Sequence, residues 1–124
     1  MTVVRYAPCM PYDLRLDQFS TEEEAVALAT AAGQFPMAFD FDTVHNDFHW
    51  HNFEAMLYVV SGEITITERD TGDACTVTSG STIRATTPQL VHKEDTEGYR
   101  AVFGFLRDPA EITQPIDRDP ALLG

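Results

Sequence analysis

Apolar and polar side chains alternate with a period of two over much of the chain after residue 36. Met37, Phe39 and Phe41 alternate with small or acidic residues, which predicts a half-buried strand because successive side chains of a strand point to opposite faces. Similar runs predict strands at 47–51, 55–60, 63–69, 74–78, 81–86, 90–95 and 99–107, and turn residues such as Ser61-Gly62 separate them. Many short strands of this kind indicate an antiparallel sandwich, jelly roll or barrel.

One helix is predicted before these strands. The run Ser20-Thr21-Glu22-Glu23 has the spacing of a capping box, in which the Ser20 hydroxyl accepts a hydrogen bond from the Glu23 amide. Acidic residues in the first turn are favoured by the helix dipole, and Gly33 suits the position after the helix end. The pattern therefore predicts a helix at 21–32.

Charge and composition narrow the classes of partner. The chain has 20 acidic and 8 basic residues and a formal net charge of −12, which repels nucleic-acid phosphates and anionic lipid, so neither partner is expected. The longest apolar run, 55–60, is far shorter than a membrane helix, and no secretory signal precedes it, which predicts a cytoplasmic location. Cys9 and Cys75 lack CxxC spacing and are expected to be reduced thiols.

Three histidines form a candidate metal site. His49 and His51 lie two residues apart in a predicted strand, so they project from one face and can reach one ion. His92 follows a turn and a β-run, and it can return to that face from a partner strand. Three neutral imidazoles with open positions are typical of a catalytic metal site, and the alternative is a polar strand face with hydrogen-bonded histidines.

The stretch HWHNFEAMLYVVSGE, followed by GSTIRATTPQLVH, resembles the two motifs of the cupin superfamily. Those motifs are HxH, a short gap, Glu, six residues and Gly, and then Gly, a β-run, a Pro-containing turn and His; the resemblance spans about residues 37–107. It implies a small antiparallel β-barrel of jelly-roll type, a double-stranded β-helix, with a metal held inside. The ligands that it implies for one divalent transition metal (iron, zinc, manganese, nickel or copper) are His49, His51, Glu54 and His92.

The sequence leaves the roles of two residues open, Glu54 and His45. The family glutamate falls at Ala55, one residue after Glu54, and in an unbroken strand Glu54 points outward unless a bend or bulge re-aims it. Glu54 is therefore either a ligand that also transfers protons or a surface carboxylate. His45 precedes the first motif and is either a second proton-transfer group or an exposed loop histidine.

We expect a single cupin domain over 1–124, with an N-terminal arm and helix at 1–34, a β-barrel at 35–107 and a C-terminal tail at 108–124. The expected function is that of a metal-dependent enzyme, of isomerase, lyase or dioxygenase type, acting on a small polar metabolite. A non-catalytic module that binds or senses a small molecule, and a metal-free barrel, are the alternatives. Apolar residues expected on the exterior predict a homodimer; they are Trp50, Met56, Tyr58 and Val60.

Overall fold

The computed structural model describes residues 5–7, 9, 11–51, 54–86, 90–108, 110 and 117–118. Their fold is mainly antiparallel β with one short helix, which confirms the predicted class. The elements are β1 (Arg5–Ala7), β2 (Tyr12–Leu16), α1 (Glu22–Ala31), β3 (Phe35–Phe41), β4 (Val44–His45), β5 (Trp50–His51), β6 (Ala55–Glu68), β7 (Ala74–Thr78), β8 (Thr82–Ala85), β9 (His92–Thr96), β10 (Tyr99–Phe105) and β11 (Asp117–Arg118). No helix among these elements has the length and apolar character needed to cross a membrane.

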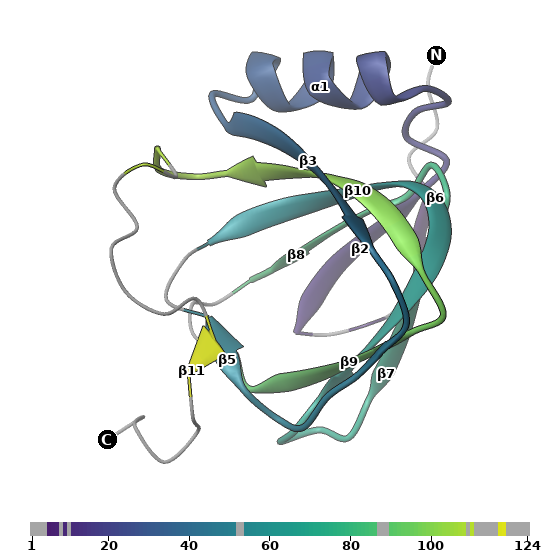
Figure 1. Ribbon diagram of the computed structural model, residues 1–124, viewed down its shortest axis with the longest axis vertical. Coiled ribbons are helices and arrows are strands. Elements are labelled where there is room, and N and C mark those ends of the chain that lie inside the picture. The colour runs from purple at the N-terminus through teal and green to yellow at the C-terminus, as the bar shows by residue number, and fades with distance from the viewer. Residues whose placement is uncertain are drawn as a thin grey trace.

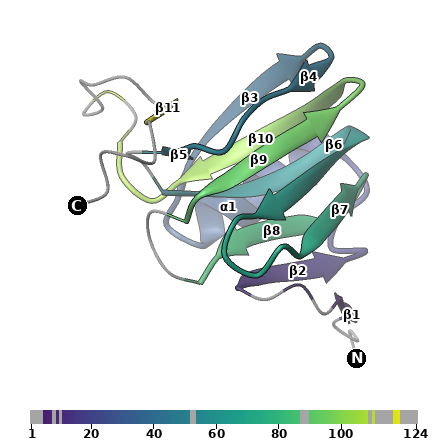
Figure 2. The same ribbon diagram turned by 90° about the horizontal axis from the view of Figure 1, so that it is seen from below.

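Strand β6 organises the sheet (Figure 1). Its first half pairs with β8 and β10, and its second half pairs with β7 and β9. One layer therefore follows the order β1-β2-β8-β6-β10-β3, and the other contains β7, β6, β9 and β4. Figure 2 shows β6 between β9 and β10 on one side and β7 and β8 on the other. Within the described ranges no pairing joins the outer strands β1 and β3, so closure into a barrel stays a prediction.

The turn predicted at Ser61-Gly62 is wrong, because β6 runs through it as one strand of 14 residues. Its register against β10 shifts between Arg100 and Ala101, so that Val60 is the extra residue of a bulge. Gly62 has a φ of +73°, and a Cβ there would collide with the Gly98 carbonyl. The bulge changes which side chains face the core, from the odd positions before it to the even positions after it.

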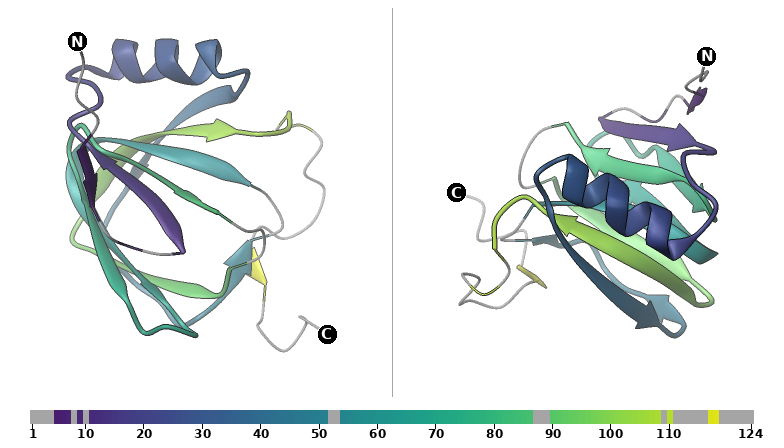
Figure 3. Two further views of the ribbon diagram at one scale, coloured as in Figure 1. Left: turned by 180° about the vertical axis from the view of Figure 1, so that it is seen from behind. Right: turned by 90° about the horizontal axis from the view of Figure 1, so that it is seen from above.

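Helix α1 lies across the outer side of β3, β6 and β10 (Figure 3). Its fully buried residues, Ala25 and Ala29, pack with Phe19, Tyr58 and Val102, and Met56 and Val60 border this cluster. The expectation that Met56, Tyr58 and Val60 form an exterior patch is therefore wrong, because the chain covers them with its own helix. Trp50 is also buried, at 8% exposure. These residues therefore no longer support the predicted homodimer.

The helix cap and the N-terminal arm also differ from the expectation. Thr21, not Ser20, is the N-cap, and its hydroxyl accepts a hydrogen bond from the Glu24 amide at 3.2 Å. The arm is part of the sheet, since β2 pairs with β8. Most of the expected C-terminal tail and the turn at Pro88 lie outside the described residues; within the tail, β11 pairs with β5.

The two cysteines are joined, which corrects the expectation of free thiols. Cys9 and Cys75 form a disulfide with a Cα–Cα distance of 5.9 Å, and both residues are buried in the main core. The bond connects the chain just before β2 to the second residue of β7. Spacing alone did not reveal it, because 66 positions separate the two residues.

Candidate metal centre

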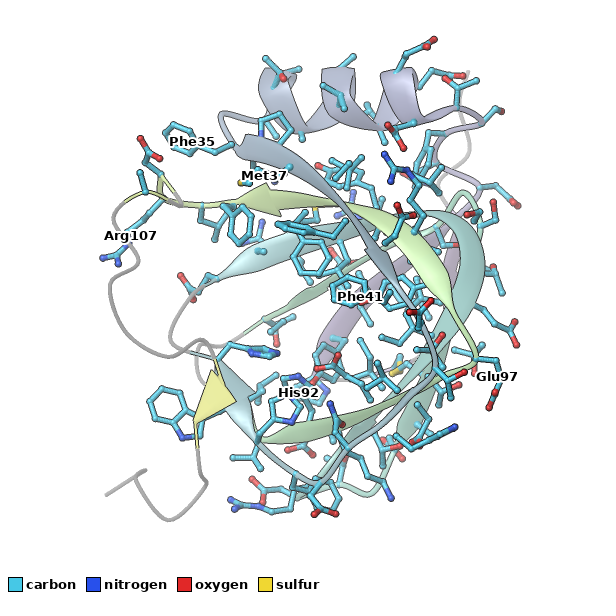
Figure 4. All side chains as sticks on the ribbon, viewed as in Figure 1. Phe35, Met37, Phe41, His92, Glu97 and Arg107 are labelled. Carbon is cyan, nitrogen blue, oxygen red and sulfur yellow. A yellow bond between two sulfur atoms is a disulfide. The ribbon has the colours of Figure 1, made fainter. Side chains whose placement is uncertain are left out.

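Backbone pairing brings His49 and His92 face to face. The His49 amide donates to the His92 carbonyl at 2.8 Å, and the His92 amide donates to the His49 carbonyl at 2.9 Å. His51 lies two residues along the same segment, so its ring shares the face of His49. The ring centroids are 4.8 Å apart for His49 and His51, 4.7 Å for His49 and His92, and 4.9 Å for His51 and His92. The structure thus brings together the three histidines that the sequence singled out, with His92 pointing inward from β9 (Figure 4).

The carboxylate of this group is Glu94, two residues after His92 in β9. Its Oε1 atom lies 3.0 Å from Nε2 of His49, 3.4 Å from Nε2 of His51 and 3.2 Å from Nε2 of His92. One ligand atom from each of the four side chains lies within 4.8 Å of all the others. The arrangement is a compact group of three nitrogens and one oxygen that could hold a metal ion.

Two of the imidazoles are oriented by backbone carbonyls. Nδ1 of His49 lies 2.9 Å from the Asp47 carbonyl oxygen, and Nδ1 of His92 lies 2.9 Å from the Leu90 carbonyl oxygen. A carbonyl only accepts hydrogen bonds, so each Nδ1 carries the proton, and in the neutral ring the lone pair is on Nε2. Both Nε2 atoms then face the group in the form that binds metal, which is the usual outer-sphere arrangement of histidine ligands.

The charge of Glu94 requires a positive partner. Burial alone raises the pKa of this carboxyl, but hydrogen bonds with His49, His51 and His92 hold the pKa of Glu94 far below its ordinary value. Those hydrogen bonds need a proton on each Nε2 atom, and in neutral rings that carry their proton on Nδ1 the carboxylate would instead face nitrogen lone pairs. A metal cation among these four atoms, or protons on the rings, would satisfy both kinds of ligand atom, so the donor set fits a divalent metal.

The carboxylate predicted from the family spacing, Glu54, lies outside this group. Its side chain is exposed, it precedes the first residue of β6, and its carbonyl accepts a hydrogen bond from the Leu106 amide at 3.0 Å. The inward positions of this segment begin at Ala55 and continue at Leu57 and Val59, so Glu54 is out of phase with them. It lines the cavity described below but is not among the four residues whose ligand atoms lie within 4.8 Å of one another.

His45 is also away from the group. It belongs to β4, where its Nδ1 lies 2.8 Å from Asp95 and its Nε2 lies 3.0 Å from Glu97. The hydrogen bond to Asp95, followed by that to Glu97, raises the pKa of His45 above its ordinary value. Figure 4 shows Glu97 at the outer edge of the molecule, so His45 is engaged in a surface network. Proton transfer at the candidate site by His45 stays a prediction without support from this geometry.

A cavity of about 120 Å³ adjoins His51, His92 and Glu94. Its walls come from β6, β8, β9 and β10 and from Tyr12 of β2, and most of the lining side chains are apolar. Phe41 of β3 stacks on Tyr99, a further lining residue, with a centroid distance of 4.8 Å. A small molecule in this cavity would therefore contact the candidate metal ligands at one end and hydrocarbon along its length.

The sequence contains the signal for Glu94, although the family spacing led to Glu54. His92 and Glu94 are two residues apart in a predicted strand, which is the same relationship that placed His49 beside His51. Applying the period of two to the second histidine segment predicts a carboxylate on the histidine face. The cupin motif places its carboxylate after the first histidine pair, so it predicts Glu54 in place of Glu94.

Comparisons with known proteins support the fold only. No family model matches the chain, and no curated protein matches it. A solved structure of a protein of unknown function from Pseudomonas syringae pv. tomato, of the DUF861 family, is similar with a TM-score of 0.51 and 13% identity, over 85% of this chain and 45% of that one. This chain thus spans less than half of that protein. A DUF861 protein from Thermotoga maritima is similar with a TM-score of 0.48 and 12% identity, over 70% of this chain and 94% of that one.

Proposed function

We propose that this chain is a cupin-type protein that binds one divalent transition metal through His49, His51, His92 and Glu94. The observation that carries the proposal is the approach of three Nε2 atoms to one oxygen of Glu94, at 3.0, 3.4 and 3.2 Å. The cupin resemblance of the sequence and the antiparallel β-fold support it independently. The metal is iron, zinc, manganese, nickel or copper: imidazole ligands suit iron, zinc, nickel and copper, and the carboxylate oxygen suits manganese.

We further propose that the chain is a metal-dependent enzyme of isomerase, lyase or dioxygenase type that acts on a small metabolite. A bound metal would polarise an oxygen of the substrate or lower the pKa of a bound water. The protein's own contribution is to fix the imidazoles through the Asp47 and Leu90 carbonyls, to orient Glu94, and to exclude water with the apolar cavity wall.

A non-catalytic binding or sensing module is the second candidate. It is favoured by the position of His45, whose two ring nitrogens are engaged by Asp95 and Glu97 on the surface. The homodimer and the cytoplasmic location expected from the sequence remain proposals. The Cys9–Cys75 disulfide weighs against the location, because structural disulfides are rare in reducing compartments.

The test is the metal content of the purified protein and of single variants, measured by elemental analysis together with metal affinity. We expect stoichiometric metal in the wild type and a loss of affinity of about 10-fold to 100-fold or more in His49→Ala, His92→Ala and Glu94→Gln. Glu54→Gln is the matched control, since it removes the other carboxylate of the region, and we expect it to retain metal. A wild type without metal after supplementation would contradict the proposal, and loss of metal in Glu54→Gln but not in Glu94→Gln would reverse the assignment of the carboxylate.

A further inference from the structure

The wall of the cavity beside the four-residue group is mostly apolar, whereas the group itself is polar. It is formed largely by hydrocarbon side chains, including Leu57, Ile64, Ile66, Ile83, Leu90 and Phe103. A wholly polar molecule would lose its hydration against these hydrocarbon side chains without gaining hydrogen bonds from them. The cavity therefore suits a molecule with an apolar body, which narrows the class of small metabolite expected from the sequence.

Besides the candidate metal ligands, four polar side chains in the described ranges line the cavity: Tyr12, Glu54, Arg84 and Tyr99. Tyr12 is the one that comes from the N-terminal strand β2. It is 7% exposed, it lines the cavity, and it stands opposite Ala85, another lining residue, in the ladder between β2 and β8. Its hydroxyl oxygen is buried and has no hydrogen-bond partner among the described residues. A buried hydroxyl without an acceptor destabilises a fold, so such a group calls for a functional explanation.

Contacts with Cys9, three residues before it in the sequence, hold Tyr12 in position. Its amide donates to the Cys9 carbonyl at 2.8 Å, and Cys9 is bonded to Cys75, which stands opposite Ile66 in the cavity wall. Burial, and then the charges of Glu68 and Glu94, raise the pKa of the Tyr12 phenol. The phenol thus stays protonated at neutral pH and has an O–H that can donate a hydrogen bond to an acceptor placed near it.

We propose that Tyr12 donates a hydrogen bond to the carboxylate of a ligand that binds in this cavity with its carboxylate toward the candidate metal site and its apolar body along the hydrocarbon wall. The inference rests on the proposed metal-binding function. A divalent ion held by three neutral imidazoles and one carboxylate keeps a net positive charge, which favours an anionic head group. The ligand acceptor would complete the hydrogen bonding of the buried hydroxyl.

Tyr12→Phe tests the proposal, with Tyr99→Phe as the matched control. Both substitutions remove one hydroxyl from the same cavity, but of these two hydroxyls only that of Tyr12 is buried without a hydrogen-bond partner among the described residues. The probes are acetate, butyrate and hexanoate, titrated into the cobalt(II)-loaded wild type and variants and followed by the visible absorption of the metal. A salt concentration of about 150 mM reduces the repulsion of these anions by the chain's negative charge.

We expect the affinity of the wild type to rise with chain length, by up to about fourfold for each CH₂ group buried. Tyr12→Phe is expected to bind cobalt as well as the wild type and to bind hexanoate about 10-fold or more weakly, as for loss of a hydrogen bond to a charged group. Tyr99→Phe is expected to stay within about twofold of the wild type. The unliganded Tyr12→Phe variant should melt at or slightly above the wild-type temperature, since it loses an unsatisfied hydroxyl, whereas a purely structural tyrosine would give a lower value.

The outcomes separate the two proposals. A wild type that binds no cobalt overturns the metal site and this inference together. Cobalt binding with equal hexanoate affinities in the wild type and Tyr12→Phe overturns the role of Tyr12 and leaves the metal site standing. Cobalt binding with no response to any of the three carboxylates, or an affinity that does not rise from acetate to hexanoate, overturns the ligand class.

Discussion

At the scale of single residues, the candidate site depends on imidazole nitrogens that are oriented by hydrogen bonds to backbone carbonyls close by in the sequence. His49 and His92 are held by the carbonyls of residues two positions before each of them, so their rings are oriented before any ligand binds. Glu94 adds a half-buried carboxylate, one oxygen of which faces all three rings. Once the segment with His49 and His51 meets the segment with His92 and Glu94, these contacts orient the ligand atoms of the candidate site.

His45 is a residue whose protonation is linked to stability. Asp95, and then Glu97, raise the pKa of His45 by hydrogen bonding to both ring nitrogens. A group with a raised folded-state pKa stabilises the fold fully below its unfolded pKa, and this stabilisation is lost as the pH rises through the folded-state pKa. We therefore expect His45→Gln to be less stable than the wild type at about pH 6 and equally stable at about pH 9.

Thermal unfolding at the two pH values measures the difference, and NMR titration of the His45 ring measures its pKa directly. Asp95→Asn should lower the pKa of His45, and Glu97→Gln should lower it to a smaller degree, following the order of the two contributions. The effect on stability is expected to be small because the ring is 54% exposed. A His45 ring that titrates at or below about 6.5 would contradict this prediction.

At the scale of elements, α1 is the part of the fold that covers the outer side of the sheet. It begins after Thr21 and buries only two alanines, which lets its backbone approach β10 and β6 closely. Tyr58 beneath it donates a hydrogen bond to Gln34 at 2.8 Å, just after the helix. The helix therefore completes a second apolar cluster, separate from the cavity, and protects the outer side chains of β6 from water.

The cap of α1 provides a test at this scale. Thr21→Ala removes the hydroxyl that accepts from the Glu24 amide, and we expect a loss of about 1 kcal/mol in the free energy of unfolding. Ser20→Ala is the control, because Ser20 would be the cap if the capping-box spacing had set the helix start; we expect a loss of a few tenths of a kcal/mol at most. Urea unfolding measures both, and a larger loss for Ser20→Ala than for Thr21→Ala would place the cap one residue earlier.

At the scale of the whole molecule, the disulfide joins segments that are distant in sequence. It links the chain before β2 to β7, and so closes a loop that contains α1, β6 and the first histidine pair. Because a cross-link over 66 positions restricts the unfolded chain, we expect the Cys9→Ser, Cys75→Ser double variant to lose about 2–5 kcal/mol of unfolding free energy.

Chemical denaturation with and without a reducing agent measures this loss. The reduced wild type should match the double variant, and the reducing agent should leave the variant unchanged, which is the internal control. Coincident curves for the oxidised wild type and the double variant would contradict the prediction. The same comparison carried out on the cobalt-loaded protein shows whether the position of Tyr12 depends on the bond, since hexanoate affinity should fall when Cys9 no longer holds the start of β2.

Local pattern by itself determined the class of the fold and the three histidines. The period of two predicted most strands, the acidic first turn predicted α1, and the spacing of His49 and His51 placed their rings on one face. These are properties of neighbouring residues, and backbone geometry fixes them wherever the segment lies. The same logic would have predicted Glu94 from His92, so that omission came from reliance on the motif spacing.

Only the tertiary structure decided which segments meet. The continuation of β6 through Ser61 and Gly62 depends on the pairing with β10, the covering of Tyr58 depends on where α1 packs, and the disulfide depends on β2 lying beside the rest of the sheet. Tyr12 lines the cavity for the same reason, since it reaches the site from a strand far from both histidine segments in sequence. Contacts between distant segments are set by the packing of the whole chain, and no local period encodes them.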